Sequence, residues 1–320
     1  MTTGKKNYNI DDYISDSLQK KHENKPDRMI RMVLPNGDVV IGKNRYDAIK
    51  KLPEDKRLKS QKEQIKIFED YHGITDYIKK AEEEFRETEK KLEAQELKKQ
   101  QIISSINKKS VWEVFLKSYK KYYNVDFEQT PETIKNIAPI VTYFAKDKEF
   151  LKYGVKGSNG RFLSQPSLDK GLCIIGGFGN GKTSIMTTIQ KMFIGLDGYS
   201  FGRFSSHEIV RMYEEASKNK NSEILENFWK KLSKSDLYID DVKAEPDALS
   251  FGRKNLLNSL FQERYNKKLK THISINYATG KNGDALEAIL EFKSRYSNQV
   301  YDRIYEMYNI IEFKGKSFRK

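Results

Sequence analysis

The pattern of hydrophobic and polar residues changes near Lys170. From there to the end of the chain, short apolar runs alternate with amphipathic segments. The apolar runs predict strands at 172–175, 200–204, 237–239, 272–275 and 309–313. The amphipathic segments predict helices at 182–193, 207–216, 223–232, 253–267, 284–292 and 297–307. Strands that alternate with helices indicate an α/β fold of three layers, with a five-stranded parallel sheet between helices.

The chain before Lys170 has a mainly helical pattern. Helices are expected at 111–123 and 131–144, and a long charged helix at about 61–109 with a break near Gly73. Apolar positions in the long helix alternate spacings of four and three, as in a coiled coil: Ile74, Ile78, Ala81, Phe85, Thr88 and Leu92. This helix could pair with a partner helix, pack on its own domain, or form a solvated spacer.

A hairpin is expected near the amino end. Pro35-Asn36-Gly37 separates the apolar runs 29–34 and 38–41, and a short helix follows at 44–52. The segment could be a small partner-binding module or a weakly ordered arm. We therefore expect an arm or hairpin module at 1–57, a charged helical or coiled-coil region with a linker at 58–130, and the α/β domain at 131–320.

The clearest chemistry lies in one glycine-rich segment. Gly176-Gly177-Phe178-Gly179-Asn180-Gly181-Lys182-Thr183 fits the P-loop pattern, directly after an expected strand and at the start of a helix. Main-chain N–H groups of this loop and of Ser184 are expected to surround the phosphates of ATP. Lys182 should reach the β- and γ-phosphates, and the Thr183 hydroxyl should bind Mg²⁺.

Two aspartates follow the strand expected at 237–239, which should stop at them. Asp240 is expected to hold Mg²⁺ through water, and Asp241 to activate the attacking water. A helix cap or an acidic turn is the alternative interpretation of this pair. Glu245 is a weaker candidate for the same polar cluster. Asn276, at the end of the next strand, could orient the water or could simply end the strand.

Arg303 lies in the helix before the last expected strand. An arginine at this position could stabilise transition-state charge on the nucleotide of a neighbouring subunit. The alternative is an exposed helical arginine without a role in the chemistry.

Composition narrows the choice of partners. The chain has 59 Lys and Arg against 45 Asp and Glu, a net charge of +14, which favours nucleic acid as a partner, although a Lys-rich soluble surface would give the same excess. The single cysteine, Cys173, lies in an apolar run and excludes a disulfide framework. Because no signal or membrane-spanning segment is present in the sequence, we expect a cytoplasmic protein without a membrane partner.

Four segments, GLCIIGGFGNGKTS, LYIDDVKAEP, THISINYA and VYDRIYEMYNIIEFKGKSFR, resemble the AAA+ ATPases of the DnaC-type helicase loader family, which includes the IstB-like transposition ATPases. The similarity covers about residues 131–320 and implies no C-terminal lid domain. Carried over by position, the family's site residues are the Walker A pair Lys182 and Thr183, the Walker B pair Asp240 and Asp241, the sensor Asn276, the trans-acting finger Arg303 and the terminal Arg319 near the nucleotide.

The resemblance implies an ATP-dependent helicase loader that acts as an oligomer on single-stranded DNA, holds the replicative helicase and hydrolyses ATP with Mg²⁺ during DNA replication. Alternatives are an IstB-like ATPase that binds duplex DNA and recruits a transposase, a nucleotide-gated scaffold, and a small-molecule kinase. Asp241 stands where AAA+ proteins usually have Glu, which predicts slow hydrolysis. The amino-terminal region does not resemble the expected helicase-binding arm, which leaves the protein partner open.

Overall fold

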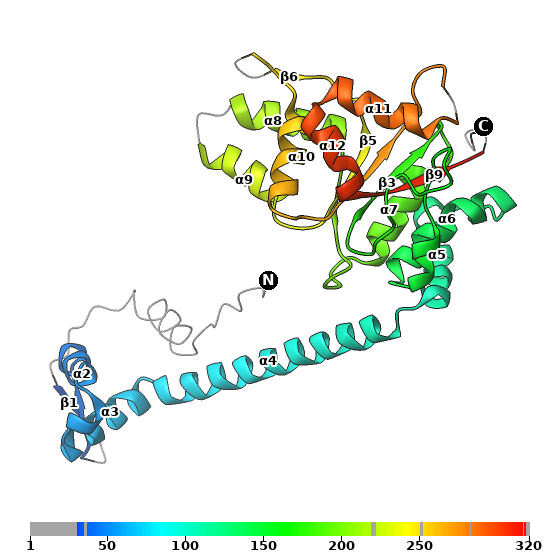
Figure 1. Ribbon diagram of the computed structural model, residues 1–320. Helices are drawn as coiled ribbons and strands as arrows, with labels where there is room; N and C mark the ends of the chain where they lie inside the picture. Colours follow the sequence, from blue (N-terminus) through cyan, green and yellow to red (C-terminus); the bar gives the residue numbers. More distant parts are fainter. Residues whose placement is uncertain are drawn as a thin grey trace. The chain divides into compact units, whose positions relative to one another are not determined.

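The computed structural model describes residues 31–34, 37–218, 222–249, 252–281, 283–315 and 317 (Figure 1). The chain divides into two compact units, residues 1–100 and 101–320. The structure thus leaves out residues 1–30 of the expected amino-terminal arm, and Arg319 also lies outside the described residues.

The first unit contains the expected hairpin and a small core. Strands β1 (Arg31–Val33) and β2 (Val39–Ile41) pair antiparallel, and α2 (Lys43–Lys50), a 3₁₀ turn (Glu54–Lys56) and α3 (Lys59–Tyr71) follow. The hairpin and its helix are confirmed, while Pro35 and Asn36 of the turn lie outside the described residues. The core consists of apolar side chains from β2, α2, α3 and the first residue of α4: Val40, Ile41, Ile49, Ile65, Phe68 and Ile74.

The long charged helix is broken where the sequence predicts. α3 ends before Gly73, whose φ of +63° suits glycine, and α4 runs from Ile74 to Ser105. On α4, Leu92 is 60% exposed, and the side chains of Ile78 and Ala81 are outside the described part. Pairing of this helix in a coiled coil stays a prediction.

The second unit is a three-layer α/β fold, as expected. Its parallel sheet has the order β4-β5-β8-β3-β9. The strands are β3 (Gly171–Gly176), β4 (Gly202–Ser205), β5 (Leu237–Val242), β8 (Thr271–Ile275) and β9 (Tyr308–Phe313). The helices are α5 (Lys108–Tyr123), α6 (Pro131–Phe144), α7 (Lys182–Met192), α8 (Ser206–Lys218), α9 (Ser222–Leu232), α10 (Leu256–Asn266), α11 (Ala285–Arg295) and α12 (Asn298–Met307).

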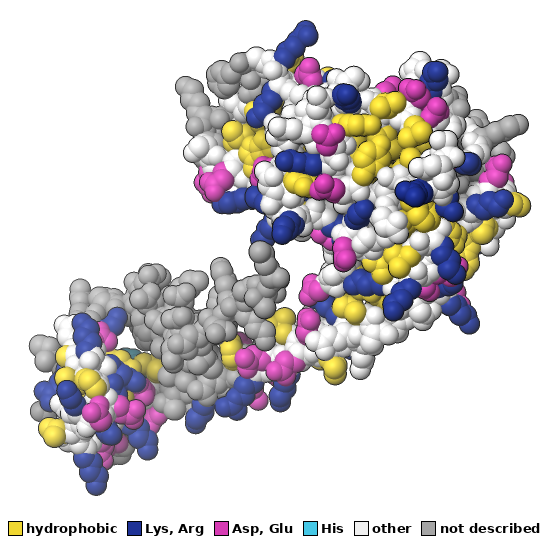
Figure 2. All heavy atoms as spheres, in the orientation of Figure 1, with side chains coloured by type: hydrophobic (Ala, Val, Ile, Leu, Met, Phe, Trp, Pro, Cys, Tyr) yellow, Lys and Arg dark blue, Asp and Glu magenta, His cyan; other side chains and the backbone are white. Residues whose placement is uncertain are grey.

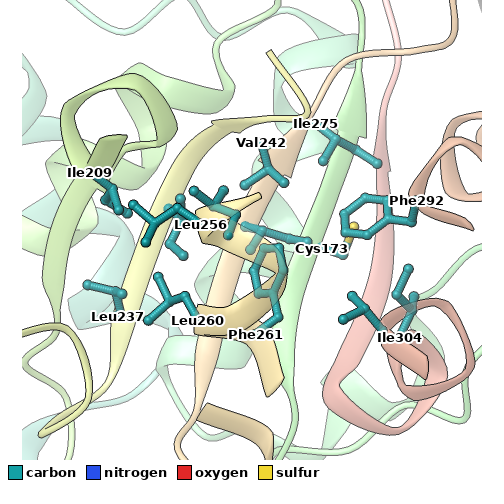
Figure 3. Close-up of a cluster of buried hydrophobic side chains, with 14 of the residues drawn as sticks. Cys173, Ile209, Leu237, Val242, Leu256, Leu260, Phe261, Ile275, Phe292 and Ile304 are labelled. Atoms are coloured by element: carbon teal, nitrogen blue, oxygen red, sulfur yellow. The ribbon is translucent and has the colours of Figure 1, made fainter. Parts of the chain in front are cut away.

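Helices cover both faces of this sheet because its central strands are apolar on both sides. In β3, Cys173 and Ile175 face the core beneath α8 to α12, whereas Leu172 and Ile174 face the core beneath α5, α6 and α7. Figure 3 shows the first of these cores, where Cys173 and Ile275 from the sheet lie beside Phe292 of α11. Because β8 pairs in parallel with both β3 and β5, the carboxyl ends of these three strands lie side by side.

Two expectations about local structure are wrong. The strand expected to stop at the aspartates continues through them to Val242. Arg253–Lys254, expected to begin a helix, forms the short strand β7, which pairs antiparallel with β6 (Ala248–Leu249), and α10 begins only at Leu256. Asn255 caps α10 by accepting a hydrogen bond from the backbone N of Asn258, which fixes the later start.

Helix α5 is part of the packed second unit. Its Val111 and Phe115 are buried in the core beneath α5, α6 and α7, where Phe115 contacts the rings of Trp112 and Phe127. α5 lies against α7, the helix that follows the P-loop. Within the described ranges, no helix combines the length and the apolar character needed to cross a membrane.

Candidate nucleotide site

The P-loop connects β3 to α7, and two glycines shape it. Gly181, the N-cap of α7, has a φ of +90°, a conformation that a side chain disfavours. At Gly176, an added Cβ would lie 2.4 Å from Asn180 Nδ2 and 2.7 Å from the carbonyl oxygen of Phe313. The motif therefore requires glycine at its first position for close approach and at its sixth for backbone conformation.

Asn180 ties the P-loop to the last strand. Its side chain is 1% exposed, and its Nδ2 donates to the carbonyl oxygen of Phe313 in β9 at 2.8 Å. Phe178, at the tip of the same loop, is 75% exposed. These two side chains thus differ in role within the segment predicted to bind ATP: one braces the loop and the other faces solvent.

Lys182 lies at the centre of the site and is 6% exposed. Its ammonium donates to the carbonyl oxygens of Gly176 and Gly177 at 2.8 and 2.7 Å. It also donates to Oδ1 of Asn276, at the end of β8, at 3.0 Å. The lysine of the motif and the asparagine expected near it are therefore in direct contact.

Asp240 and Asp241 lie in a β-bulge of β5, between Ile239 and Val242. Ile239 pairs with Ile273 and Val242 pairs with Ile275, so β5 advances three residues where β8 advances two. Ile239 and Val242 both face the core beneath α8 to α12, and Asp241, with a φ of +56°, projects out of the ladder. A bulge of this kind redirects a side chain, here the carboxylate of Asp241, toward the edge of the sheet.

Asp240 is buried among hydroxyl groups. Its Oδ1 accepts hydrogen bonds from Thr183 at 3.1 Å, from Tyr238 at 2.7 Å and from Ser274. Burial and the neighbouring Asp240 raise the pKa of Tyr238, so its hydroxyl stays protonated and remains a donor. The other oxygen of Asp240, Oδ2, lies 3.5 Å from Nη2 of Arg203.

Asn276 joins Lys182 to Asp241. Its Nδ2 donates to Oδ1 of Asp241 at 3.0 Å, while its Oδ1 accepts from Lys182. The backbone of Asp241 is held as well, because its N–H donates to Ser274 Oγ at 3.0 Å and its carbonyl accepts from Ser206 Oγ at 2.7 Å. The structure thus brings the expected P-loop, aspartate and asparagine residues together at the carboxyl ends of β3, β5 and β8.

Arg203 is a member of the site that the sequence analysis missed. It lies on β4, whose pairing with β5 sets Ser205 opposite Asp240. No motif marks this arginine, and its place beside Asp240 depends on the strand order. A basic residue in the strand before the aspartates was the available signal, but the sequence does not specify which strand lies next to β5.

Glu245 lies in a second polar cluster, behind Asp241. Its carboxylate is 5% exposed, accepts from the hydroxyl of Tyr296 at 2.8 Å and lies 3.5 Å from Arg295. Burial raises the pKa of this carboxyl above its usual value. The structure therefore places Glu245 with Tyr296 and Arg295.

Arg303 lies away from the P-loop of its own chain. It is on α12, which ends directly before β9 begins, so it lies near the edge where the strands start, opposite the P-loop edge. Its guanidinium carbon is 4.1 Å from the ring centroid of Tyr265, itself near the end of α10. Arg303 therefore cannot reach the P-loop of its own chain.

The hydroxyl and carboxylate oxygens of the site suit a hard divalent cation. Thr183 Oγ1 and Asp240 Oδ1 are 3.1 Å apart, and oxygen ligands are those that Mg²⁺ prefers. Thr183 and Asp240, the two residues expected to hold Mg²⁺, thus fit this role by chemistry and by position.

No protein-family model matches the chain, and no curated protein matches it significantly. Among solved structures, the chain is similar to the DnaC helicase loader at 24% identity and a TM-score of 0.38, over 46% of this chain and 79% of that one. It is similar to DnaI at 18% identity and a TM-score of 0.38, over 60% and 90% of the two chains. It is similar to AMPPCP-bound DnaA from Aquifex aeolicus at 16% identity and a TM-score of 0.34, over 45% and 40%.

Three features of the structure define the type of domain. The sheet is parallel with the order β4-β5-β8-β3-β9, the P-loop follows β3, and the aspartate pair lies near the end of β5. Strand β8, followed by Asn276, lies between β3 and β5. The second unit is therefore a P-loop domain, with a five-stranded parallel sheet between two layers of helices.

Proposed function

We propose that this protein binds ATP at 176–184 and hydrolyses it with Mg²⁺. The observation that carries the proposal is one continuous set of hydrogen bonds, from Asp241 through Asn276 to Lys182, with Thr183 bonded to Asp240 beside it. A lysine, a hydroxyl, two carboxylates and an amide at the end of a P-loop are the groups that phosphoryl transfer to water requires.

Each side chain has a role that follows from its charge and position. Lys182 would exchange its contacts with the loop carbonyls for phosphate oxygens, which carry more negative charge. Thr183 and Asp240 would hold Mg²⁺, which supplies charge compensation for the phosphates when bound. Asp241 projects from the bulge and would accept a proton from the attacking water, with Asn276 fixing the direction of the carboxylate.

Subunit assembly would complete the site. Because Arg303 lies at the edge of the sheet opposite its own P-loop, it can act only on the nucleotide of a neighbouring copy. An arginine supplied in this way stabilises negative charge in the transition state. The terminal Arg319 remains a candidate for contact with the nucleotide on the resemblance alone.

The biological role we propose is that of a DnaC-like helicase loader on single-stranded DNA in DNA replication. The resemblance of the four motif segments and the net charge of +14 support it. Figure 2 shows Lys and Arg spread over the visible surface among Asp and Glu, so the charge excess is not gathered in one patch on this face. The IstB-like ATPase and the nucleotide-gated scaffold are the alternatives.

ATP turnover by the purified chain tests the proposal. We expect Mg²⁺-dependent release of phosphate that single-stranded DNA stimulates. Lys182→Ala should abolish tight ATP binding because the phosphates lose their buried ammonium. Lys191 is an exposed lysine on the same helix, and Lys191→Ala should bind ATP normally. Binding of a fluorescent ATP analogue measures both variants.

The outcomes separate the candidate functions. Turnover that requires a small-molecule acceptor would support a kinase, and tight binding without turnover would support the scaffold. Stimulation by duplex DNA only, with capture of a transposase instead of a helicase from the native host, would support the IstB-like role. If the chain binds no nucleoside triphosphate in the presence of Mg²⁺, the proposal is wrong.

A further inference from the structure

Lys243 has a backbone conformation that lysine rarely adopts. Its φ is +78°, in the left-handed region where glycine is the usual residue. It follows the bulge of β5, two residues after Asp241, which also has a positive φ. Conformations of this kind persist where the surrounding structure holds them, and they gather at functional sites.

The contacts of Lys243 hold both its side chain and its backbone. The side chain is 10% exposed, and its ammonium donates to the carbonyl oxygens of Asn276 at 3.1 Å and Ala288 at 3.0 Å. It also forms an ion pair with Glu291 of α11. The backbone N–H of Lys243 donates to the hydroxyl of Tyr296 at 3.0 Å.

The hydrogen bond from Lys243 to the carbonyl oxygen of Asn276 connects Lys243 to the nucleotide site. Asn276, whose carbonyl oxygen accepts from Lys243, is the residue whose amide accepts from Lys182 and donates to Asp241. The ammonium of Lys243 therefore fastens the main chain of Asn276 to the segment that carries Asp241. The contacts with Ala288 and Glu291 fasten the same point to α11.

We infer that Lys243 is a positioning residue for ATP hydrolysis: its ammonium holds the backbone of Asn276 so that the amide keeps the carboxylate of Asp241 in place. This inference rests on the proposed ATPase function. Lys243 is not a catalytic residue, because its contacts are with the protein and not with the groups that would meet the phosphates. Its removal should lower the turnover number and leave nucleotide affinity nearly unchanged.

Two variants distinguish the effect of losing the ammonium from the effect of relieving the backbone strain. Lys243→Ala and Lys243→Gly both remove the ammonium, but only glycine relieves the positive φ. We expect both variants to hydrolyse ATP about tenfold or more slowly at saturating ATP, with affinity for a fluorescent ATP analogue within about twofold of the parent, as for loss of an interaction that acts in the transition state. Lys243→Gly should unfold at a higher temperature than Lys243→Ala.

Lys268 provides the matched control, because it is an exposed lysine with a φ of +52° in the turn after α10. Lys268→Gly should keep parental turnover. If Lys243→Gly hydrolyses ATP at the parental rate while Lys243→Ala does not, the strain and not the ammonium matters and the inference is wrong. Parental rates in both variants would also overturn it. A parent that binds ATP without hydrolysing it would instead contradict the proposed function.

Discussion

At the scale of single residues, the site depends on one amide. Asn276 accepts from Lys182 at 3.0 Å and donates to Asp241 at 3.0 Å, so the two charged groups are held by the same planar side chain. The P-loop residues could be predicted from the sequence because their spacing is specific. The contact between Lys182 and Asn276 could not, because it requires that β8 lie next to β3, and no local pattern encodes strand order.

Asp241→Asn should separate binding from chemistry. The amide keeps the size of the carboxylate but cannot accept a proton from water, so we expect ATP affinity within about threefold of the parent and turnover reduced by about a hundredfold or more. Phosphate release under saturating ATP measures the effect. Turnover within a factor of two of the parent would show that a group other than Asp241 accepts the proton of the attacking water.

His272 makes the stability of the second unit depend on pH. Burial, with Lys270 and Arg264 nearby, lowers the pKa of His272 from 6.5 to about 3, and its Nδ1 accepts from the backbone N–H of Leu172. The unfolded chain binds a proton below about pH 6.5 and the folded chain does not, so stability is lost as pH falls from that value. The slope should be about 1.2 kcal/mol per pH unit between about pH 6 and pH 5.

Urea unfolding at several pH values measures this slope. Asp236 and Glu245, whose pKa values burial raises, act in the opposite direction. Both the parent and His272→Asn retain these carboxyls, so their contribution cancels when the slope of one protein is subtracted from that of the other. Equal slopes for the two proteins would show that His272 accepts a proton in the folded state.

At the scale of elements, a regular pattern of apolar residues predicts a helix or strand, whereas bulges and very short strands leave no such pattern. The apolar run before Asp240 predicts a strand, but Val242 stands alone after two aspartates, and a single apolar residue does not show that the strand resumes beyond a bulge. Strands β6 and β7 have two residues each, too few for any alternation to be visible. The bulge also directs Asp241 toward the site. The position of this carboxylate therefore depends on a feature that the sequence pattern does not predict.

Helix α5 should be required for the fold of the P-loop unit. Phe115 is fully buried and packs with Phe127 and Trp112, so Phe115→Ala should lower the free energy of unfolding by about 3–5 kcal/mol. Its neighbour Val114 is 44% exposed, and Val114→Ala should change stability by less than about 0.5 kcal/mol. Urea unfolding of the full chain checks both. Equal effects would mean that α5 is not part of the cooperative unit.

At the scale of the whole molecule, the position of Arg303 predicts activity that is shared between copies. Arg303→Ala should bind ATP normally and lose turnover, whereas Lys182→Ala should lose binding. A mixture of the two inactive variants should recover turnover, because the intact site of one copy meets the intact arginine of the other. Phosphate release measured against the fraction of each variant tests this.

Arg211→Ala is the control for the loss of a charge, since Arg211 is an exposed arginine of α8. It should behave as the parent. If the mixture stays as inactive as its components, or if dilute monomers of Arg303→Ala hydrolyse at the parental rate, Arg303 does not act across a subunit boundary.

The hydrogen bond from Asn180 to Phe313 has a consequence for biosynthesis. The two residues are far apart in the chain, and translation makes the glycine-rich loop long before the strand that braces it. A nascent chain arrested on the ribosome before β9 emerges should therefore be unable to retain ATP, although its motif is complete. Newly made protein would therefore retain its nucleotide only after β9 has been synthesised and has paired with β3.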